Sequence, residues 1–62
     1  MNMNIAIASA IEALEKSEKQ FTAYAKHHQA KGALDKATTN YGFAVMCGRA
    51  CEHLKLVQMA VP

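Results

Sequence analysis

Apolar residues recur at spacings of three and four in two long stretches, which a short polar segment separates. In the first stretch the repeating positions are Ile7, Ile11, Leu14, Glu18, Phe21, Ala25 and His28. Positions spaced in this way share one face of an α-helix, because the helix turns once every 3.6 residues. The pattern predicts a helix from about residue 4 to 31, with Asn2 or Asn4 as its N-cap.

The second stretch predicts a helix from about residue 36 to 59. Its apolar face is expected to hold Phe43, Cys47, Ala50, Leu54, Val57 and Val61. A flanking stripe of mostly small residues consists of Ala37, Tyr41, Ala44, Gly48 and Cys51. Gly32 suits the left-handed position that ends many helices, and Asp35 suits the N-cap of the second helix. We therefore expect a turn at about residues 32–35.

A fold-back at this turn brings large and small residues into compatible pairs. In an antiparallel hairpin closed near Gly32, the numbers of opposing residues add to about 65. The opposing pairs are then Phe21 and Phe43, Leu14 and Ala50, Ile11 and Leu54, Ile7 and Val57, Ala25 and Asn40, and His28 and Ala37. The sequence therefore predicts an all-α fold: one domain over residues 1–62, folded as an antiparallel two-helix hairpin.

A chain of 62 residues buries little apolar surface by itself, and each of two long helices leaves the other half exposed. Gly42 and Gly48 also lie inside the second predicted helix, where each glycine costs about 1 kcal/mol. Close approach of another backbone would explain them. We expect a homo-oligomeric helical bundle: a dimer of four helices or a larger ring. Whether each helix pairs within its own chain or with a swapped copy stays open.

Composition limits the location and the partners of the protein. The net charge is +2, and the positive charge gathers near the predicted turn. That basic density is too low for general nucleic-acid binding. No apolar run is long enough to span a membrane, and the N-terminus lacks the basic start of a signal peptide. Cys47 and Cys51, four residues apart in one predicted helix, are expected to be reduced thiols. We expect a cytoplasmic protein that does not bind membranes.

Metal binding and catalysis find little support. Cys47 and Cys51 could both reach one zinc ion, with His53 nearby, but Cys47 belongs to the predicted core and His27 and His28 lie far away. The acidic residues of the first helix lie near solvent, and no nucleophile, base and orienting group can be placed together. We expect no metal, no cofactor and no enzymatic activity.

Polar and aromatic residues that suit a small anion converge at the closed end of the predicted hairpin. They are Tyr24, His27, His28, Lys31, Lys36, Asn40 and Tyr41. Aromatic rings stack on bases, lysines neutralise phosphates, and an amide reads donor and acceptor edges. The start of the second helix adds free N–H groups. The alternative is structural: a buried histidine, an asparagine that fixes register, and solvated lysines.

The run Phe21, Tyr24, His28, Lys31, Gly32, Asp35, Lys36, Ala37, Asn40, Phe43 and Ala44 resembles a pattern in small proteins of tailed bacteriophages. The predicted architecture is also similar to the helical hairpins of phage anti-defence sponges, which form oligomers and sequester nucleotide immune signals between subunits. That resemblance implies a ligand site formed by Tyr24, His28, Lys31, Lys36 and Asn40.

The resemblance also suggests a function. It implies a phage anti-defence protein of the host cytoplasm that binds itself and a cyclic oligonucleotide or ADP-ribose-like signal without converting it. Two alternatives stay open: an inhibitor that lays an apolar face on a host enzyme or CRISPR complex, and a purely structural oligomer.

Overall fold

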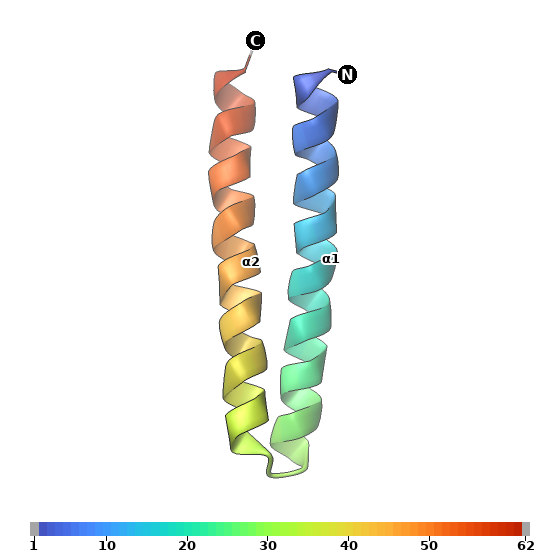
Figure 1. Ribbon diagram of the computed structural model, residues 1–62, viewed down its shortest axis with the longest axis vertical. Coiled ribbons are helices and arrows are strands. Elements are labelled where there is room, and N and C mark those ends of the chain that lie inside the picture. Colours follow the sequence, from blue (N-terminus) through green and yellow to red (C-terminus); the bar gives the residue numbers. More distant parts are fainter. Residues whose placement is uncertain (1, 62) are drawn as a thin grey trace.

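The computed structural model describes residues 2–61 and consists of two antiparallel helices joined by a tight turn. Helix α1 spans Met3–Ala30 and α2 spans Leu34–Ala60. The helices lie side by side along their whole length, with the start of α1 and the end of α2 at the same end of the molecule (Figure 1). The hairpin measures 48 × 15 × 11 Å, so it is only one helix thick in its shortest direction. The predicted all-α antiparallel hairpin is confirmed.

Side-chain and backbone hydrogen bonds define both ends of α1. The Asn2 side chain is the N-cap: its Oδ1 accepts from the backbone N–H of Asn4 at 2.8 Å. At the other end Gly32 adopts a φ of 77°. The N–H of Gly32 donates to the Gln29 carbonyl, and the N–H of Ala33 donates to the His28 carbonyl. This pair of bonds closes the helix, and it needs the left-handed conformation that glycine adopts without strain.

The prediction that Asp35 caps α2 is wrong. The N-cap is Ala33, whose side chain makes no capping hydrogen bond, and Asp35 lies within the first turn of the helix. The closing bonds of α1 already orient Ala33, and Leu34 N–H donates to the Gly32 carbonyl at 3.0 Å. The turn is therefore shorter than predicted, and α2 begins two residues earlier. Asp35 still places a negative charge near the positive end of the α2 dipole.

Helix α1 presents the face that its spacing predicts. Ile7, Ile11 and Ala25 are buried. The other positions of the pattern are half-buried: Leu14, Glu18, Phe21 and His28. Their shared orientation follows from the three- and four-residue spacing alone.

Helix α2 is rotated relative to the prediction. Its buried residues are Ala37, Ala44 and Cys51, which belong to the stripe of small side chains. Phe43 and Val57, predicted to lie in the core, are 44% and 47% exposed. Small residues let the two backbones approach closely, and the larger side chains then lie beside the contact instead of within it. The predicted apolar face of α2 is thus the flank of the true interface.

Contacts between the helices fix their register. The rings of Phe21 and Phe43 pack with centroids 5.2 Å apart and planes tilted by 48°, as the pairing predicts. Farther from the turn, the Cys51 thiol donates to the Ile11 carbonyl at 3.7 Å, so the neighbour of Ile11 lies one turn before the predicted Leu54.

The two interior glycines differ in their surroundings. A Cβ atom on Gly48 would lie 2.7 Å from Oε2 of Glu18, so a side chain of α1 occupies the space over this glycine. A Cβ on Gly42 would meet nothing within 4 Å. Within this chain, neither glycine marks the close backbone approach that the sequence suggested.

Candidate functional site

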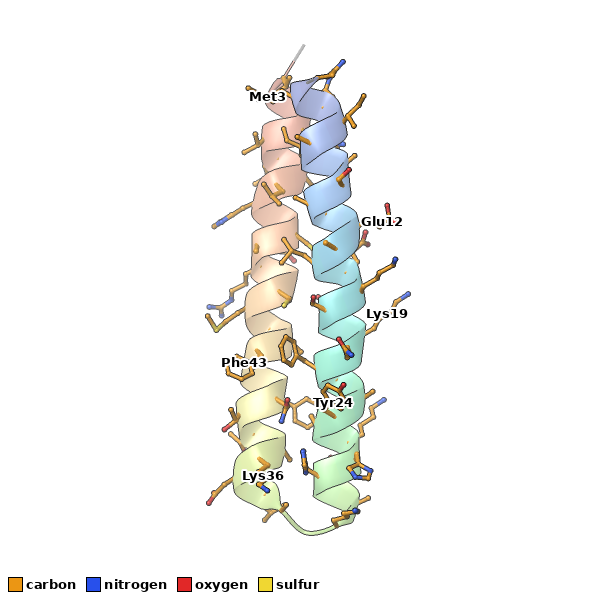
Figure 2. The ribbon with its side chains drawn as sticks, turned by 45° about the vertical axis from the view of Figure 1, so that its right-hand side comes forward. Met3, Glu12, Lys19, Tyr24, Lys36 and Phe43 are labelled. Atoms are coloured by element: carbon orange, nitrogen blue, oxygen red, sulfur yellow. The ribbon has the colours of Figure 1, made fainter. Side chains whose placement is uncertain are left out.

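Tyr24 is the most accessible aromatic residue near the turn. Its side chain is 48% exposed, and its hydroxyl accepts a hydrogen bond from the Gln20 side chain at 3.0 Å. Gln20 lies one turn earlier on α1 and therefore holds the hydroxyl in place. In Figure 2, Tyr24 and Phe43 project toward the same side of the hairpin from the two helices. The ring of Tyr24 is thus available for stacking next to an apolar surface.

The two histidines follow Tyr24 in the last turn of α1. Their rings contact each other with centroids 5.6 Å apart and planes at 67°. His27 is exposed, and His28 is half-buried. Both lie at the negative end of the α1 dipole, which favours positive charge. Their position therefore suits either an anionic ligand or helix stabilisation.

Lys31 and Lys36 stand on opposite sides of the turn, and both are exposed. Asn40 follows one helical turn after Lys36, and its side-chain amide donates to the Lys36 carbonyl at 2.8 Å. This local bond uses one of the two donor hydrogens of the amide and leaves its oxygen available. The two lysines supply exposed positive charges at this end, and a hydrogen bond to the backbone orients the Asn40 amide.

Tyr41 does not join the other candidate residues. Its hydroxyl donates to the Gln29 side chain at 3.1 Å, and this bond ties the two helices together. Tyr41 also lines a hollow of about 280 Å³ between the helices, together with Glu18, Thr22, Ala44, Val45 and Gly48. The residue after Asn40 on a helix points about 100° away, so this hollow and the Lys36–Asn40 edge face different directions. The structure gives Tyr41 a structural contact.

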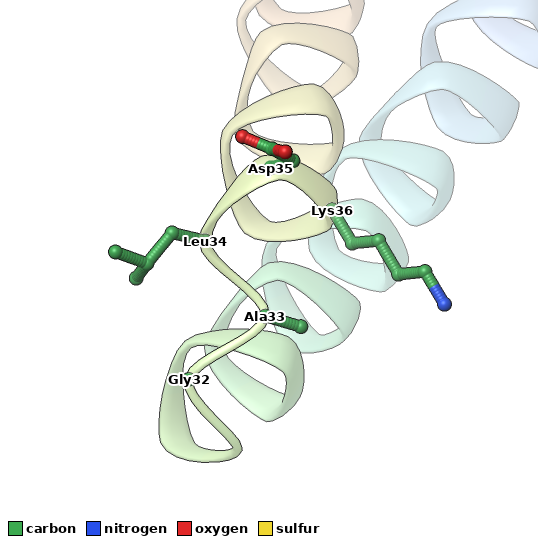
Figure 3. Close-up of a pocket in the computed structure, with 5 residues that line it drawn as sticks. All are labelled: Gly32, Ala33, Leu34, Asp35 and Lys36. Atoms are coloured by element: carbon green, nitrogen blue, oxygen red, sulfur yellow. The ribbon is translucent and has the colours of Figure 1, made fainter.

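A shallow hollow of about 390 Å³ lies at the turn itself. Figure 3 displays its lining: Gly32, Ala33, Leu34, Asp35 and Lys36. The Leu34 and Lys36 side chains extend in opposite directions, and the Asp35 carboxylate lies above the first turn of α2. Of the predicted ligand residues, Lys36 alone lines this hollow. The hollow at the turn of a single chain is therefore an open surface, to which Lys36 contributes a positive charge.

The two cysteines have different environments. Cys51 is buried and Cys47 is half-buried, and both are free thiols. Burial raises the pKa of the Cys51 thiol, and the nearby Glu15 carboxylate raises it further. A thiol that is harder to ionise is a weaker nucleophile and a weaker metal ligand. Among residues 2–61, no group of three or more His, Cys, Asp or Glu side chains is arranged to hold a metal ion.

The sequence pattern does not reveal a surface of charged side chains, because this surface spans both helices. Oε2 of Glu15 on α1 lies 4.0 Å from Nζ of Lys55 on α2, and the Glu18 carboxylate lies over Gly48. Glu12, Lys19 and Lys26 recur every seven residues and thus follow the Glu15 side of α1. Glu52 lies three residues before Lys55 and joins the same side of α2. We call this side the charged face.

The opposite side carries the Phe21–Phe43 contact, and we call it the uncharged face. On α1 it comprises Ala10, Leu14, Ser17 and Phe21. On α2 it comprises Phe43, Met46, Cys47, Ala50, Leu54 and Val57. These positions are three, four or seven residues apart and contain no charged side chain. In Figure 2, Phe43 and Tyr24 lie on this side, and Glu12 and Lys19 project from the outer edge of α1.

Neither helix of the described part, residues 2–61, is long and apolar enough to cross a membrane. Comparisons of the chain with protein-family models, with curated proteins and with solved structures found no match. The resemblance to small phage proteins therefore remains an interpretation of the sequence pattern.

Proposed function

We propose that this hairpin is a non-catalytic, homo-oligomeric binding protein whose turn end holds a small nucleotide-type anion. The observation that carries the proposal is the placement of the candidate residues. Tyr24 and His28 follow the last residue of the uncharged face on α1, and Lys36 and Asn40 precede its first residue on α2, with Lys31 between them in the chain. A basic, aromatic end thus adjoins an apolar face.

The chemistry of these side chains suits a phosphate attached to a base. Lys31 and Lys36 are exposed and can approach one phosphate from both sides of the turn. Protonated His27 and His28 would add charge-assisted donors. The ring of Tyr24 offers a surface for stacking a base, which contributes about 1–3 kcal/mol in comparable sites. Asp35 at the start of α2 repels an anion, so the ligand would lie closer to the two lysine side chains than to the Asp35 carboxylate.

Enclosure of the ligand would come from a second copy. Five large apolar side chains on or beside the uncharged face are 44–66% exposed in one chain: Met3, Tyr24, Phe43, Met46 and Val57. Covering them would supply both the apolar burial that a 62-residue chain lacks and a wall for the open basic end. In line with the resemblance to phage sponges, the proposed ligand is a nucleotide immune signal that is sequestered unchanged.

Titration calorimetry tests the ligand directly. We expect heat with at least one member of a panel of cyclic dinucleotides, cyclic trinucleotides and ADP-ribose derivatives, and the ligand should be recovered intact. Lys31→Ala with Lys36→Ala should weaken binding at least tenfold. Lys16→Ala with Lys19→Ala is the matched control: it removes the same charge from the middle of α1 and should bind normally. Equal affinity of both double variants would place the site elsewhere.

A second candidate function follows from the same exposed apolar side chains. An amphipathic helical face can dock in a groove of another protein, and the uncharged face could thus inhibit a host enzyme. The two functions give opposite results in one experiment. Recovery of a stable one-to-one complex with a host protein, together with silence across the nucleotide panel, would favour the inhibitor.

A further inference from the structure

We infer that the uncharged face is the contact between two copies of this chain, and that they pack antiparallel with α2 on α2. The inference rests on the oligomer that the proposed function includes, and it adds the symmetry and the residues at the centre. A second copy is the occupant because the face has no charged side chain and because its small and large side chains can interlock with those of an inverted copy.

The distribution of charge selects this face. The described charged side chains from Glu12 to Lys26 of α1 and from Arg49 to Lys55 of α2 lie off it. His53 lies at its outer edge. An interface core without charge avoids the desolvation of unpaired ions. Of the other five exposed apolar residues, Val45, Leu56 and Met59 alternate with Arg49, Glu52 and Lys55 on the charged side of α2, and Ile5 and Leu34 lie near the ends of the helices. The uncharged face is therefore the better surface for burial.

Two symmetric arrangements are possible on such a face. With the two-fold axis along the helices, both turns lie at the same end, and α1 of one copy packs on α2 of the other. With the axis across the helices, the turns lie at opposite ends, and each helix packs antiparallel on its own equivalent. Both arrangements bury the same side chains, so charge and size must decide between them.

Charge favours the antiparallel arrangement, in which the two-fold axis runs across the helices. His27, His28, Lys31 and Lys36 all belong to the turn end. The arrangement with both turns together would bring two such basic clusters side by side. The antiparallel arrangement separates them by nearly the length of the hairpin, 48 Å, where screening removes their repulsion.

Side-chain size also favours the antiparallel arrangement. The Glu18–Gly48 and Phe21–Phe43 contacts place the level midway between Cys47 and Ala50 of α2 opposite residues 16–17 of α1. An axis at that level sets Cys47 against Ala50 of the second copy, and Phe43 against its Leu54. Small residues meet near the axis, and larger ones interlock on both sides, as packed helices require.

Ser17 lies at the centre of this arrangement on α1. In the antiparallel arrangement, Ser17 faces Ser17 of the second copy. In the arrangement with both turns at the same end, Ser17 faces Cys47 of the second copy, which lies at the same level on the other helix. The footprint, 48 by 15 Å, is comparable with the roughly 800 Å² per partner that stable complexes bury.

Disulfide trapping distinguishes the two axes. Ser17→Cys in a chain that also carries Cys47→Ala and Cys51→Ala has one thiol, and we expect it to form a covalent dimer under mild oxidation. The control mixes this variant with a chain that carries only Cys51→Ala and keeps Cys47. Preferential crosslinking in the mixture between the thiol introduced at position 17 and Cys47 would overturn the antiparallel inference in favour of parallel packing.

The mass of the unmodified protein in solution separates failure of the inference from failure of the oligomer. A strict monomer would contradict both. An oligomer in which neither thiol pair crosslinks would contradict this interface alone and leave the proposed oligomer standing. Ala50→Glu should dissociate the dimer, and Leu56→Glu, on the charged side of α2, should not. If Ala50→Glu also unfolds the chain, the crosslinking result still decides the geometry.

Discussion

The effect of a substitution on the stability of this hairpin depends on the space that the facing helix leaves at that position. Gly48 and Gly42 are equivalent in the sequence, since both interrupt α2 with a residue of low helix propensity. In the structure they differ, because the Glu18 carboxylate occupies the position of a Gly48 Cβ and nothing occupies that of Gly42. The same residue type therefore has two different mutational outcomes.

Replacing these glycines tests that difference. Gly42→Ala should raise the free energy of unfolding by about 1 kcal/mol, because alanine favours the helix and meets no neighbour. Gly48→Ala should give a smaller gain or a loss, because the Glu18 side chain must move away. Urea denaturation measures both, and Gly48→Ala in a Glu18→Ala background should recover the full gain. Destabilisation by Gly42→Ala would instead indicate close packing against another copy at this site.

The Cys51 thiol links stability to pH. Its pKa is raised by burial and by Glu15, so the folded chain retains the thiol proton to higher pH than the unfolded chain does. This stabilisation is complete below the ordinary cysteine pKa of 9.0 and is lost as the pH rises through the folded-state value. Unfolding measured between about pH 8 and about pH 10 should show declining stability, less steep for Cys51→Ala. Cys47→Ala, which keeps Cys51, should decline as the parent protein does.

At the scale of the elements, the turn joins α1 to α2 with very few residues. The closing hydrogen bonds of α1 use Gly32 and Ala33, and α2 starts at the next residue. Gly32 has a positive φ, and a Cβ atom at this position would meet nothing within 4 Å, so its role is one of backbone conformation. Ala33 serves as an N-cap without a capping side chain. Gly32 is thus the residue best suited to its backbone conformation, whereas a capping side chain at position 33 would improve the start of α2.

The glycine of the turn should resist substitution. Gly32→Ala is expected to lower the free energy of unfolding by about 1–2 kcal/mol, because an L-residue is strained at a φ of 77°. Chemical denaturation measures the loss. Gly42→Ala, the same change in helical backbone, is the control and should have the opposite sign. A neutral Gly32→Ala variant would show that the turn rearranges without loss.

The N-cap of α2 should accept improvement. Ala33→Ser supplies a side-chain oxygen for the free N–H groups of the first turn and should stabilise the hairpin by about 1 kcal/mol. Thermal melts followed by circular dichroism measure the change. Ala30→Ser, within the last turn of α1, offers no cap and serves as the comparison; an equal shift in both variants would speak against capping.

The whole molecule has a thin core. Among its described residues six hydrophobic side chains are buried, and the three on α2 are two alanines and a cysteine. Ten large apolar side chains of the same described part are exposed. A hairpin one helix thick has no second layer to cover them, which is the physical reason for expecting self-association.

Concentration should therefore control stability. If folding and association are coupled, the midpoint of thermal unfolding rises with protein concentration by mass action. We expect such a rise over a roughly hundredfold range of concentration, and a smaller one for Ala50→Glu. A midpoint that does not depend on concentration, with sedimentation at the monomer mass, would mean that the hairpin is stable alone.

The sequence by itself determined the two helices, the turn at Gly32, the contact face of α1 and the Phe21–Phe43 pair. These depend on periodicity and on local backbone preferences, which the order of residues encodes directly. The candidate site was predicted as one cluster, and the structure separates Tyr41 from it because adjacent helical residues point in different directions.

Only the tertiary structure decided which stripe of α2 meets α1. Both stripes have helical spacing, so hydropathy favoured the larger residues, whereas close approach of two backbones selected Ala37, Ala44 and Cys51. That rotation displaced Phe43 and Val57 to the side, where with Leu14 and Ser17 they form the uncharged face. A surface composed of two helices has no signature in either one alone, because its residues become neighbours only when the chain folds back.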